Sequence, residues 1–359
     1  MYEEWLNRIA LSIVLRNSSR NGHALIDMYG SATLAIAQRP DIFEGKIAQA
    51  RCLAEKEVEF IEKHKIRPYF YKDDNYPYRL ANCVDAPLIL YAKGNVDVNP
   101  KHALSVVGTR MPTERGKDLC RRMILDMAAS VSDLAIISGL AYGIDVIAHK
   151  AALEAGIPTI IIPAHGLDRI YPSVHRSVAV QSLDLGGILT EYTTGTTPER
   201  FNFVARNRII AGMADAILVV ESKVKGGSLI TADMGVDYGR DVFAVPGRVE
   251  DAISAGCNDL IKRHKAQLVE SADDLISAMQ WQREKKESIQ TQLLEMMLEL
   301  TPSQQQLIDL LREFEEGMHI NQLVLETQLA YNVVSAELIL LELNDVVKSM
   351  PGGMWRIKK

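Results

Sequence analysis

The chain has 359 residues, 47% of them hydrophobic, and a formal net charge of −6, which allows two or three ordinary globular domains. The acidic balance excludes a uniformly basic nucleic-acid binder, so any surface that binds phosphates must be local. Scattered cysteines without ligand spacing argue against a zinc site or a disulfide framework. The lack of a signal-peptide profile and of an apolar run of about 18 residues predicts a cytoplasmic protein without a membrane span.

Residues 1–66 are predicted to form a small helical domain, because apolar residues recur there at helical spacing. A turn at Tyr29-Gly30-Ser31 separates two short amphipathic helices. This pattern fits a sterile-alpha-motif-like or helix-hairpin-helix unit, or a plain small helical bundle. From Pro68 to Asn95 the chain is interpreted as a linker followed by an edge strand over 88–91.

Residues 67–280 are predicted to form an α/β domain that is Rossmann-like, with a mostly parallel sheet and helices on both faces. Apolar runs of strand length alternate there with helical patterns, which is typical of a parallel sheet. The predicted strands are 103–108, 134–138, 158–163, 187–191, 216–221 and 241–246. Ligands of such sheets bind at the carboxyl ends of the strands.

The end of the chain is interpreted as a linker, 281–300, followed by a winged-helix-like domain, 301–359. Three helical patterns and a terminal hairpin predict that domain. From residue 288 to the end there are five basic residues and ten acidic ones, and the third predicted helix contains no Lys or Arg. Because a helix that reads a DNA groove should be basic, we expect this domain to bind a protein, or to regulate, rather than to read DNA.

Three glycine-containing turns follow predicted strands and precede helices. Backbone N–H groups at such a turn, together with the helix dipole, form a site for an anion. The turns therefore predict a surface that handles phosphates, and Arg110 is interpreted as a phosphate clamp or as a tie to Asp145. The candidate residues in these turns are Gly108, Thr109, Arg110, Ser138, Gly139, Lys225, Gly226, Gly227 and Ser228.

A basic segment with interleaved aromatic residues spans 198–210. Arginine is a bidentate phosphate donor and an aromatic ring stacks on an unpaired base, so the segment favours single-stranded over duplex nucleic acid. The alternative is that Phe201 and Phe203 are core residues and the arginines pair with acidic side chains. The candidate contacts are Arg200, Phe203, Arg206, Asn207 and Arg208.

Signatures of catalysis and of cofactor binding are missing from the sequence. Neither a P-loop nor a G-x-G-x-x-G fingerprint follows the predicted strands, so no cofactor is expected. Asp145 and His149 are four residues apart on a predicted helix, and we interpret them as a helix-stabilising pair or a capping arrangement. We therefore expect a binding protein and no enzyme.

Ordered motifs run from Tyr76-Pro77 to about residue 275. They include Val107-Gly108-Thr109-Arg110, Ser138-Gly139-Leu140-Ala141-Tyr142-Gly143-Ile144-Asp145, Tyr171-Pro172, Phe203-x-x-Arg206-Asn207-Arg208 and Gly227-Ser228-Leu229-Ile230-Thr231-Ala232. With these motifs the chain resembles the DNA-processing protein A (DprA, or Smf) family. In many members a basic residue follows the Tyr-Pro pair, whereas here Ser173 does, and Arg169 or Arg176 would have to substitute for it.

The resemblance implies a non-enzymatic recombination mediator. Members of the family bind single-stranded DNA and dimerise through the Rossmann-like domain. During natural transformation they protect the incoming DNA and load the RecA recombinase onto it. By position, the resemblance places Arg110 and the segment 200–206 in the DNA pocket, with 225–228 nearby.

Two other classes of function fit parts of the sequence. The sheet also resembles that of lysine-decarboxylase-like phosphoribohydrolases, whose loop reads Pro-Gly-Gly-x-Gly-Thr-x-x-Glu. Residues 225–233 lack the second Gly-Thr step and end in the shorter Asp233. The signature of the enzyme is therefore incomplete, and only detectable base release from a nucleoside monophosphate would support this hypothesis. A pure protein-interaction scaffold would leave the basic and aromatic segment unexplained.

Overall fold

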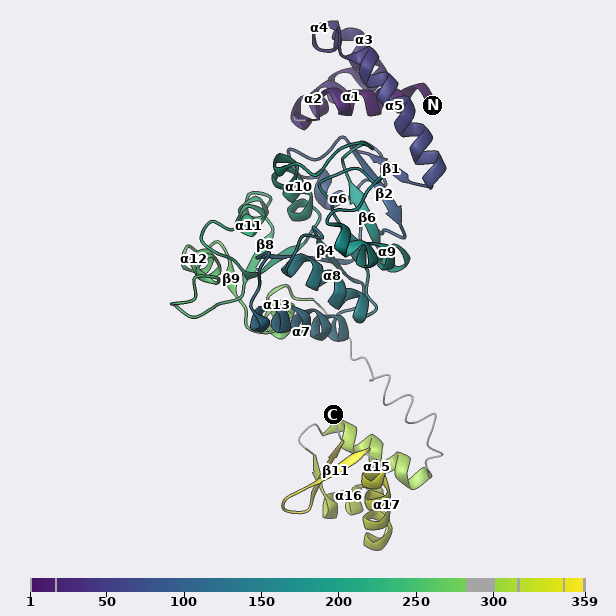
Figure 1. The fold of residues 1–359 in the computed structure, drawn as a ribbon. Coiled ribbons are helices and arrows are strands. Elements are labelled where there is room, and N and C mark those ends of the chain that lie inside the picture. The colour runs from purple at the N-terminus through teal and green to yellow at the C-terminus, as the bar shows by residue number, and fades with distance from the viewer. Residues whose placement is uncertain (1, 17, 282–300, 315–316, 345, 358–359) are drawn as a thin grey trace. The chain divides into compact units, whose positions relative to one another are not determined.

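The computed structural model describes residues 2–16, 18–281, 301–314, 317–344 and 346–357 (Figure 1). Contacts divide the chain into two compact units, Met1–Glu284 and Lys285–Lys359. All but the first residue of the predicted linker 281–300 lie outside the described residues. The predicted boundary between 1–66 and 67–280 falls inside the first unit and stays a prediction.

A sheet of nine strands forms the centre of the first unit, in the order β1-β2-β6-β5-β4-β3-β7-β8-β9. From β6 to β9 in that order neighbouring strands are parallel, whereas β1 and β2 join at one side as an antiparallel extension. The predicted mostly parallel sheet is thereby confirmed. The strands are β1 Arg67–Phe70, β2 Ile89–Gly94, β3 His102–Gly108, β4 Leu134–Ser138, β5 Thr159–Ile161, β6 Gly187–Thr190, β7 Ala216–Glu221, β8 Asp241–Ala244 and β9 Gln267–Leu268.

The interpretation of 68–95 as a linker and an edge strand needs correction. β2 lies between β1 and β6, so the edge of the sheet is β1, which contains Pro68. Proline lacks a backbone donor, and an edge strand tolerates it because one of its sides forms no ladder. The proline that suggested a linker is thus compatible with the strand.

Helices cover both faces of the sheet, and neighbouring residues of one strand serve different faces. In β3, Leu104 and Val106 belong to one apolar cluster, whereas Ala103 and Val107 belong to the other. The first cluster includes residues of α7 Glu114–Ser130, α8 Ile144–Glu154 and α13 Ala272–Ala278, and the second includes residues of α10 Arg200–Gly212, α11 Gly227–Asp237 and α12 Ala255–Lys262. Two short helices, α6 Tyr78–Ala81 and α9 Arg176–Leu185, complete this part.

The order of strands reverses at β3. The chain leaves β3 for β4 on one side, and it returns from β6 to β7 on the other side of β3. In open α/β sheets such a point leaves a crevice outside the carboxyl ends of the two strands. The carboxyl ends of β3 and β7 therefore mark the expected position of a ligand.

Five N-terminal helices pack against the antiparallel extension of the sheet. Their core includes Phe70, Leu88 and Ile89, so it is completed by residues of the sheet region. Gly30, with φ of 80°, ends the second helix as predicted, and its N–H donates to the Ile26 carbonyl oxygen. The helices are α1 Tyr2–Val14, α2 Ser19–Tyr29, α3 Ala32–Gln38, α4 Pro40–Phe43 and α5 Ile47–His64.

The second unit has the three helices and the hairpin that were predicted for 301–359. Leu307, Leu323 and Leu338, one from each helix, lie in its core. Among the described residues, no single helix is long and apolar enough to cross a bilayer; α16 and α17 pass that test only as a pair bent by 115°. The elements are α15 Pro302–Glu313, β10 Met318–His319, α16 Ile320–Thr327, α17 Tyr331–Leu343, β11 Val347–Met350 and β12 Met354–Ile357, with sheet order β10-β12-β11.

Candidate nucleic-acid interface

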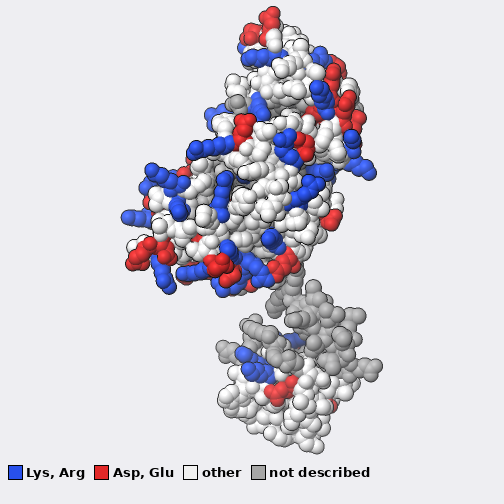
Figure 2. All heavy atoms as spheres, viewed as in Figure 1, with Lys and Arg blue, Asp and Glu red and all other residues white. Residues whose placement is uncertain are grey.

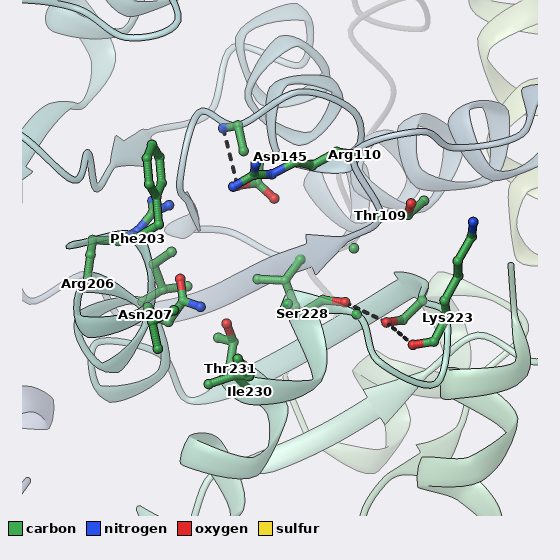
Figure 3. A pocket seen from close by; sticks show the side chains of 18 of the residues that line it. Thr109, Arg110, Asp145, Phe203, Arg206, Asn207, Lys223, Ser228, Ile230 and Thr231 are labelled. Atoms are coloured by element: carbon green, nitrogen blue, oxygen red, sulfur yellow. Dashed lines mark hydrogen bonds between the residues drawn. The ribbon is translucent and has the colours of Figure 1, made fainter. Parts of the chain in front are cut away.

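A pocket of about 310 Å³ opens at the carboxyl ends of β3 and β7, where the strand order reverses (Figure 3). α10 and the start of α11 form its other walls. On the face shown in Figure 2, Lys and Arg side chains surround the region of these two helices, and the surface there is mostly basic or uncharged. The lining residues used below are Gly108, Thr109, Arg110, Asp145, Phe203, Val204, Arg206, Asn207, Lys223, Lys225, Gly226, Gly227 and Ser228.

Glycine at position 143 lets two of the predicted turns meet. Its φ is +79°, and a Cβ atom there would lie 2.2 Å from the carbonyl oxygen of Thr109. The next N–H, of Ile144, donates to that same oxygen over 3.2 Å. The turn before α8 therefore touches the loop after β3, and this contact sets where Arg110 leaves the backbone.

The carboxylate of Glu221, at the end of β7, holds the other side of the same loop. Thr113 donates to it with its backbone N–H, over 2.9 Å, and with its hydroxyl, over 2.5 Å. The Thr113 hydroxyl oxygen also accepts the Gly116 N–H, which caps α7. Because Thr109 in addition donates its N–H to the Glu221 carbonyl oxygen, the loop carrying Arg110 is fixed at both ends.

The Phe203 ring, which lines the pocket, lies near a cation and a second ring, those of Arg110 and Tyr171. The Arg110 guanidinium lies 5.4 Å from the centroid of the Phe203 ring, and that ring lies 5.9 Å from the Tyr171 ring. Figure 3 shows Arg110 reaching past Asp145 toward the Phe203 side of the pocket. Phe203 is half-buried and Phe201 is 63% exposed, so the alternative that both rings are core residues is wrong.

Arg206 lies beneath these side chains and is only 3% exposed. Its guanidinium donates to the Ile162 carbonyl oxygen and packs on Gly139, at which any side chain would collide with it. Burial lowers the pKa of Arg206 to about 10, with Asp145 opposing that shift. Arg206 thus stays charged at neutral pH and adds positive potential under the pocket, where it is also a structural residue.

Asp145 is the buried carboxylate at the start of α8. Burial raises its pKa, whereas the nearby Arg206 and Arg110 act in the opposite direction. It accepts the Ala141 N–H over 3.3 Å, and the described residues show no ion pair between Arg110 and Asp145 within 4.0 Å. Asp145 and His149 form no hydrogen bond or ion pair with each other among the described residues, and His149 Nδ1 is instead hydrogen-bonded to the Thr159 hydroxyl over 2.7 Å.

Four predicted contacts lie outside the pocket lining. Ser138 is fully buried and donates its hydroxyl to the Val106 carbonyl oxygen, and Gly139 lies behind the Arg206 guanidinium. Arg208 pairs with Glu191 on another side of α10, and Arg200 is exposed at the start of that helix. Ser138, Gly139 and Arg208 are buried and lie outside the lining of this pocket, so we do not propose them as contacts within it.

The loop between β7 and α11 brings lysines to the opposite wall. Gly226 lies so close to Ser222 that a Cβ atom would fall 2.2 Å from its hydroxyl oxygen, and the Ser228 hydroxyl donates to that oxygen over 2.8 Å. Gly227 and Ser228 begin α11, where N–H groups have no acceptor within the helix. Lys223 lines the pocket although the glycine motif begins only at Lys225, so it is absent from the predicted contacts, and Tyr171 was predicted only as part of the Tyr171-Pro172 motif.

Comparison with known proteins assigns the family. Residues 67–280 match the family described as DNA recombination-mediator protein A, and residues 297–353 match the DprA winged helix domain. The chain belongs to the DprA family. The predicted resemblance to DprA and Smf proteins is thus confirmed.

Similar DprA and Smf proteins come from several bacteria. The DNA processing protein DprA of Streptococcus pneumoniae is 39% identical over 220 residues, which are 61% of this chain and 77% of that protein. The Smf protein of Synechocystis is 33% identical over 329 residues, covering 82% of this chain and 81% of the relative. The second match extends the similarity beyond the sheet domain.

Two solved DprA structures share the fold. The structure of the Streptococcus pneumoniae protein matches with a TM-score of 0.65 and 33% identity, covering 77% of this chain and 96% of the other. The structure of the Helicobacter pylori protein matches with a TM-score of 0.54 and 28% identity, covering 60% and 96%. The latter structure addresses a single-stranded DNA binding mode of that protein.

Proposed function

We propose that this DprA family member binds single-stranded DNA in the pocket between β3, β7, α10 and α11, and that it delivers the strand to the RecA recombinase. The observation that carries the proposal is the exposed Arg110 guanidinium held 5.4 Å from the Phe203 ring at the mouth. A cation beside a ring that is open on one side offers a phosphate contact and a stacking face within one nucleotide. The family assignment and the Helicobacter pylori relative support it.

In this proposal, different walls of the pocket contact different groups of the DNA strand. Arg110 contacts one phosphate, while Lys223, Lys225 and the N–H groups of Gly227 and Ser228 contact the next along the strand. Phe203 stacks a base, and Asn207 beside it offers an amide to a base edge. A duplex keeps its bases stacked inside, so it cannot present a base to Phe203, and single strands are preferred.

The small size of the site favours binding of DNA by a homodimer. One pocket holds only a short stretch of DNA, so a homodimer would gain affinity by engaging one strand twice. We infer that such dimers cover incoming strands in the cytoplasm during natural transformation and then pass them to RecA, without any covalent step or cofactor. The acidic winged-helix domain would serve as a protein-binding module in this scheme.

A phosphoribohydrolase remains a weaker second candidate. Its acid would be Asp233, which here forms an ion pair with Lys265 at 2.6 Å and does not line the pocket. Such a pairing removes the carboxylate from the position in which it would meet a nucleotide. Measurement of base release from a nucleoside monophosphate, with Asp233→Asn as the comparison, tests this candidate directly.

Fluorescence anisotropy with labelled single-stranded and duplex DNA at two salt concentrations tests the proposed function. We expect Arg110→Ala to weaken single-strand binding about tenfold and to reduce the salt slope by about 0.7 for the lost phosphate contact. Arg122→Ala is the matched control, because Arg122 is an exposed arginine of α7 outside this pocket. Equal binding by Arg110→Ala would move the DNA site elsewhere, and a salt slope near zero would overturn the proposal.

A further inference from the structure

A second pocket, of about 470 Å³, lies along another side of α10, between that helix and the turn that joins α1 to α2. The N-terminal helices contribute one wall of it and the sheet region contributes the rest. Residues of α10 that line it include Phe201, Asn202 and Arg208. The pocket therefore belongs to two segments that are almost 200 residues apart in the sequence.

Two arginines near the junction of α1 and α2 line this pocket, Arg16 shortly after α1 and Arg20 within α2. Arg16 and Arg20 both line it and both are exposed. Among the described residues, neither forms an ion pair with a carboxylate within 4.0 Å. Phe201 stands beside them at the start of α10 with 63% of its surface exposed. The wall thus repeats the combination of unpaired cation and open ring found at the mouth of the first pocket.

Contacts with the sheet region hold Arg16 in place. The Arg16 guanidinium lies 4.6 Å from the Tyr192 ring centroid and donates to the Asn202 side chain over 3.3 Å. Glu57 of α5 accepts both the N–H and the hydroxyl of Thr194, two residues after Tyr192. These bonds join the N-terminal helices to the segment before α10, and they preorganise Arg16 at the wall of the pocket.

The deeper part of the pocket is polar. Arg208, only 9% exposed, pairs with Glu191, and each of the two retains one buried atom without a hydrogen-bond partner, Nη1 and Oε1 respectively. Asp85 also lines the pocket, and its carboxylate accepts the Tyr238 hydroxyl over 2.6 Å. Three arginines against two carboxylates leave the lining with an excess of positive charge, which suits a phosphate-bearing ligand.

The two pockets share one lining residue. Val204 is 40% exposed and lines both of them. An α-helix with its side chains is about 10–12 Å across, so an extended strand crosses α10 within a few nucleotides. The crossing would pass Phe203 on the first side and reach Phe201 and Arg20 on the other.

We propose that the pocket between α10 and the α1–α2 turn receives the next nucleotides of the same DNA strand, with Phe201 stacking a base and Arg16 and Arg20 binding phosphates. This inference rests on the proposed function of the first pocket. It makes the N-terminal helices part of the DNA-binding surface, and it sets the length of strand that one chain holds.

A length series of labelled oligothymidylates measured by anisotropy tests the inference on the full chain. In the wild type, affinity should rise further once the oligonucleotide is long enough to cross α10. Arg20→Glu and Phe201→Ala should remove that increase, about fivefold to tenfold, while leaving the shortest binding oligonucleotides unaffected. Arg20→Ala should also reduce the salt slope by about 0.7 for long strands only.

Lys63→Glu is the matched control, because Lys63 is an exposed cation of α5 outside both pockets and undergoes the same change of charge. Loss of the length-dependent increase in Arg20→Glu but not in Lys63→Glu supports the inference. Equal behaviour of the two variants, or an unchanged increase in Arg20→Glu, overturns it. The proposed function fails separately, by loss of wild-type binding to every oligonucleotide.

Photocross-linking gives a second readout that does not depend on affinity. Strands carrying 5-iododeoxyuridine at successive positions are bound to the wild-type chain, irradiated and mapped by peptide sequencing. Cross-links to Phe201 or Tyr192 from bases a few positions beyond those that reach Phe203 support the second pocket. Cross-links confined to Phe203 and Tyr171 for every position of the label overturn it.

Discussion

At the scale of single residues, the Phe203 ring lies near both the Arg110 guanidinium and the Tyr171 ring. Stacking on a ring does not depend on ionic strength, whereas a phosphate contact does. We expect Phe203→Leu to weaken single-strand binding by about 1–2 kcal/mol with an unchanged salt slope, and Phe203→Tyr to restore most of the affinity. Anisotropy titrations over a range of salt concentrations separate the two effects. A reduced slope in Phe203→Leu would show that the ring only positions Arg110.

His149 makes the stability of the fold depend on pH. Burial lowers its pKa from an ordinary value of 6.5 to about 3, and the neighbouring Arg206 and His175 act in the same direction. The unfolded chain therefore takes up a proton near pH 6.5 that the folded chain accepts only near pH 3. Stability is fully present above pH 6.5 and declines as the pH falls, by about 2 kcal/mol at pH 5.

His149→Asn is the variant that tests this linkage, because the amide can still form a hydrogen bond with the Thr159 hydroxyl but does not titrate. Urea unfolding at pH 7 and pH 5 should show a smaller difference between the two pH values in this variant than in the wild type. An equal difference would assign the pH dependence to other groups, such as the buried His165, whose pKa burial also lowers.

The site residues that were predictable are those whose local sequence fixes their position. Arg110 follows a strand and a glycine, so its place at the carboxyl edge of the sheet could be predicted. Arg206 and Arg208 were not distinguishable from a surface cluster, because their partners, Ile162 and Glu191, are distant in the sequence. Two positions apart on a helix, they also point about 200° away from each other, which composition alone does not reveal.

At the scale of elements, the close approach of two turns is the feature on which the first pocket depends. Gly143→Ala combines a left-handed backbone with a Cβ atom 2.2 Å from the Thr109 carbonyl oxygen. We expect it to cost about 3–5 kcal/mol of stability and to weaken DNA binding by displacing Arg110. Thermal or urea unfolding together with anisotropy measures both effects.

Gly156→Ala serves as the control for this substitution. Gly156 also has a positive φ, +69°, but a Cβ atom there meets no heavy atom within 4 Å. It should cost only the backbone term, about 1–2 kcal/mol, and leave DNA binding unchanged. If the two alanine variants behaved alike, the contact between the turns would not be what positions Arg110.

The elements themselves were predictable where an apolar run is long. The predicted strands 134–138 and 216–221 match β4 and β7, because each run is buried on both faces of the sheet. β1 and β9 were missed, since β1 contains Pro68 and β9 has only two residues, both exposed. The position of β2 inside the sheet depends on its pairing with β6, which no local pattern encodes.

At the scale of the whole molecule, the two compact units have separate cores, so they can be studied apart. A chain ending at residue 284 should bind single-stranded DNA within about twofold of the full chain, because both pockets lie within it. The fragment 285–359 should not shift duplex DNA at moderate salt, since α17 has no Lys or Arg and carries Glu337 and Glu342. Electrophoretic mobility shifts test both statements, and a shifted duplex would assign DNA binding to the winged-helix domain.

The position of β2 inside the sheet affects how the chain folds while it is being synthesised. Leu88 and Ile89 complete the core of the N-terminal helices, so that part can fold soon after these residues leave the ribosome. One edge of β2 then stays unpaired until its second neighbour, β6, has been synthesised, and β6 begins at Gly187. At about 5–20 residues per second, the nascent chain carries an unpaired strand edge for roughly 5–20 s. During synthesis this edge is a point at which two growing chains could pair wrongly.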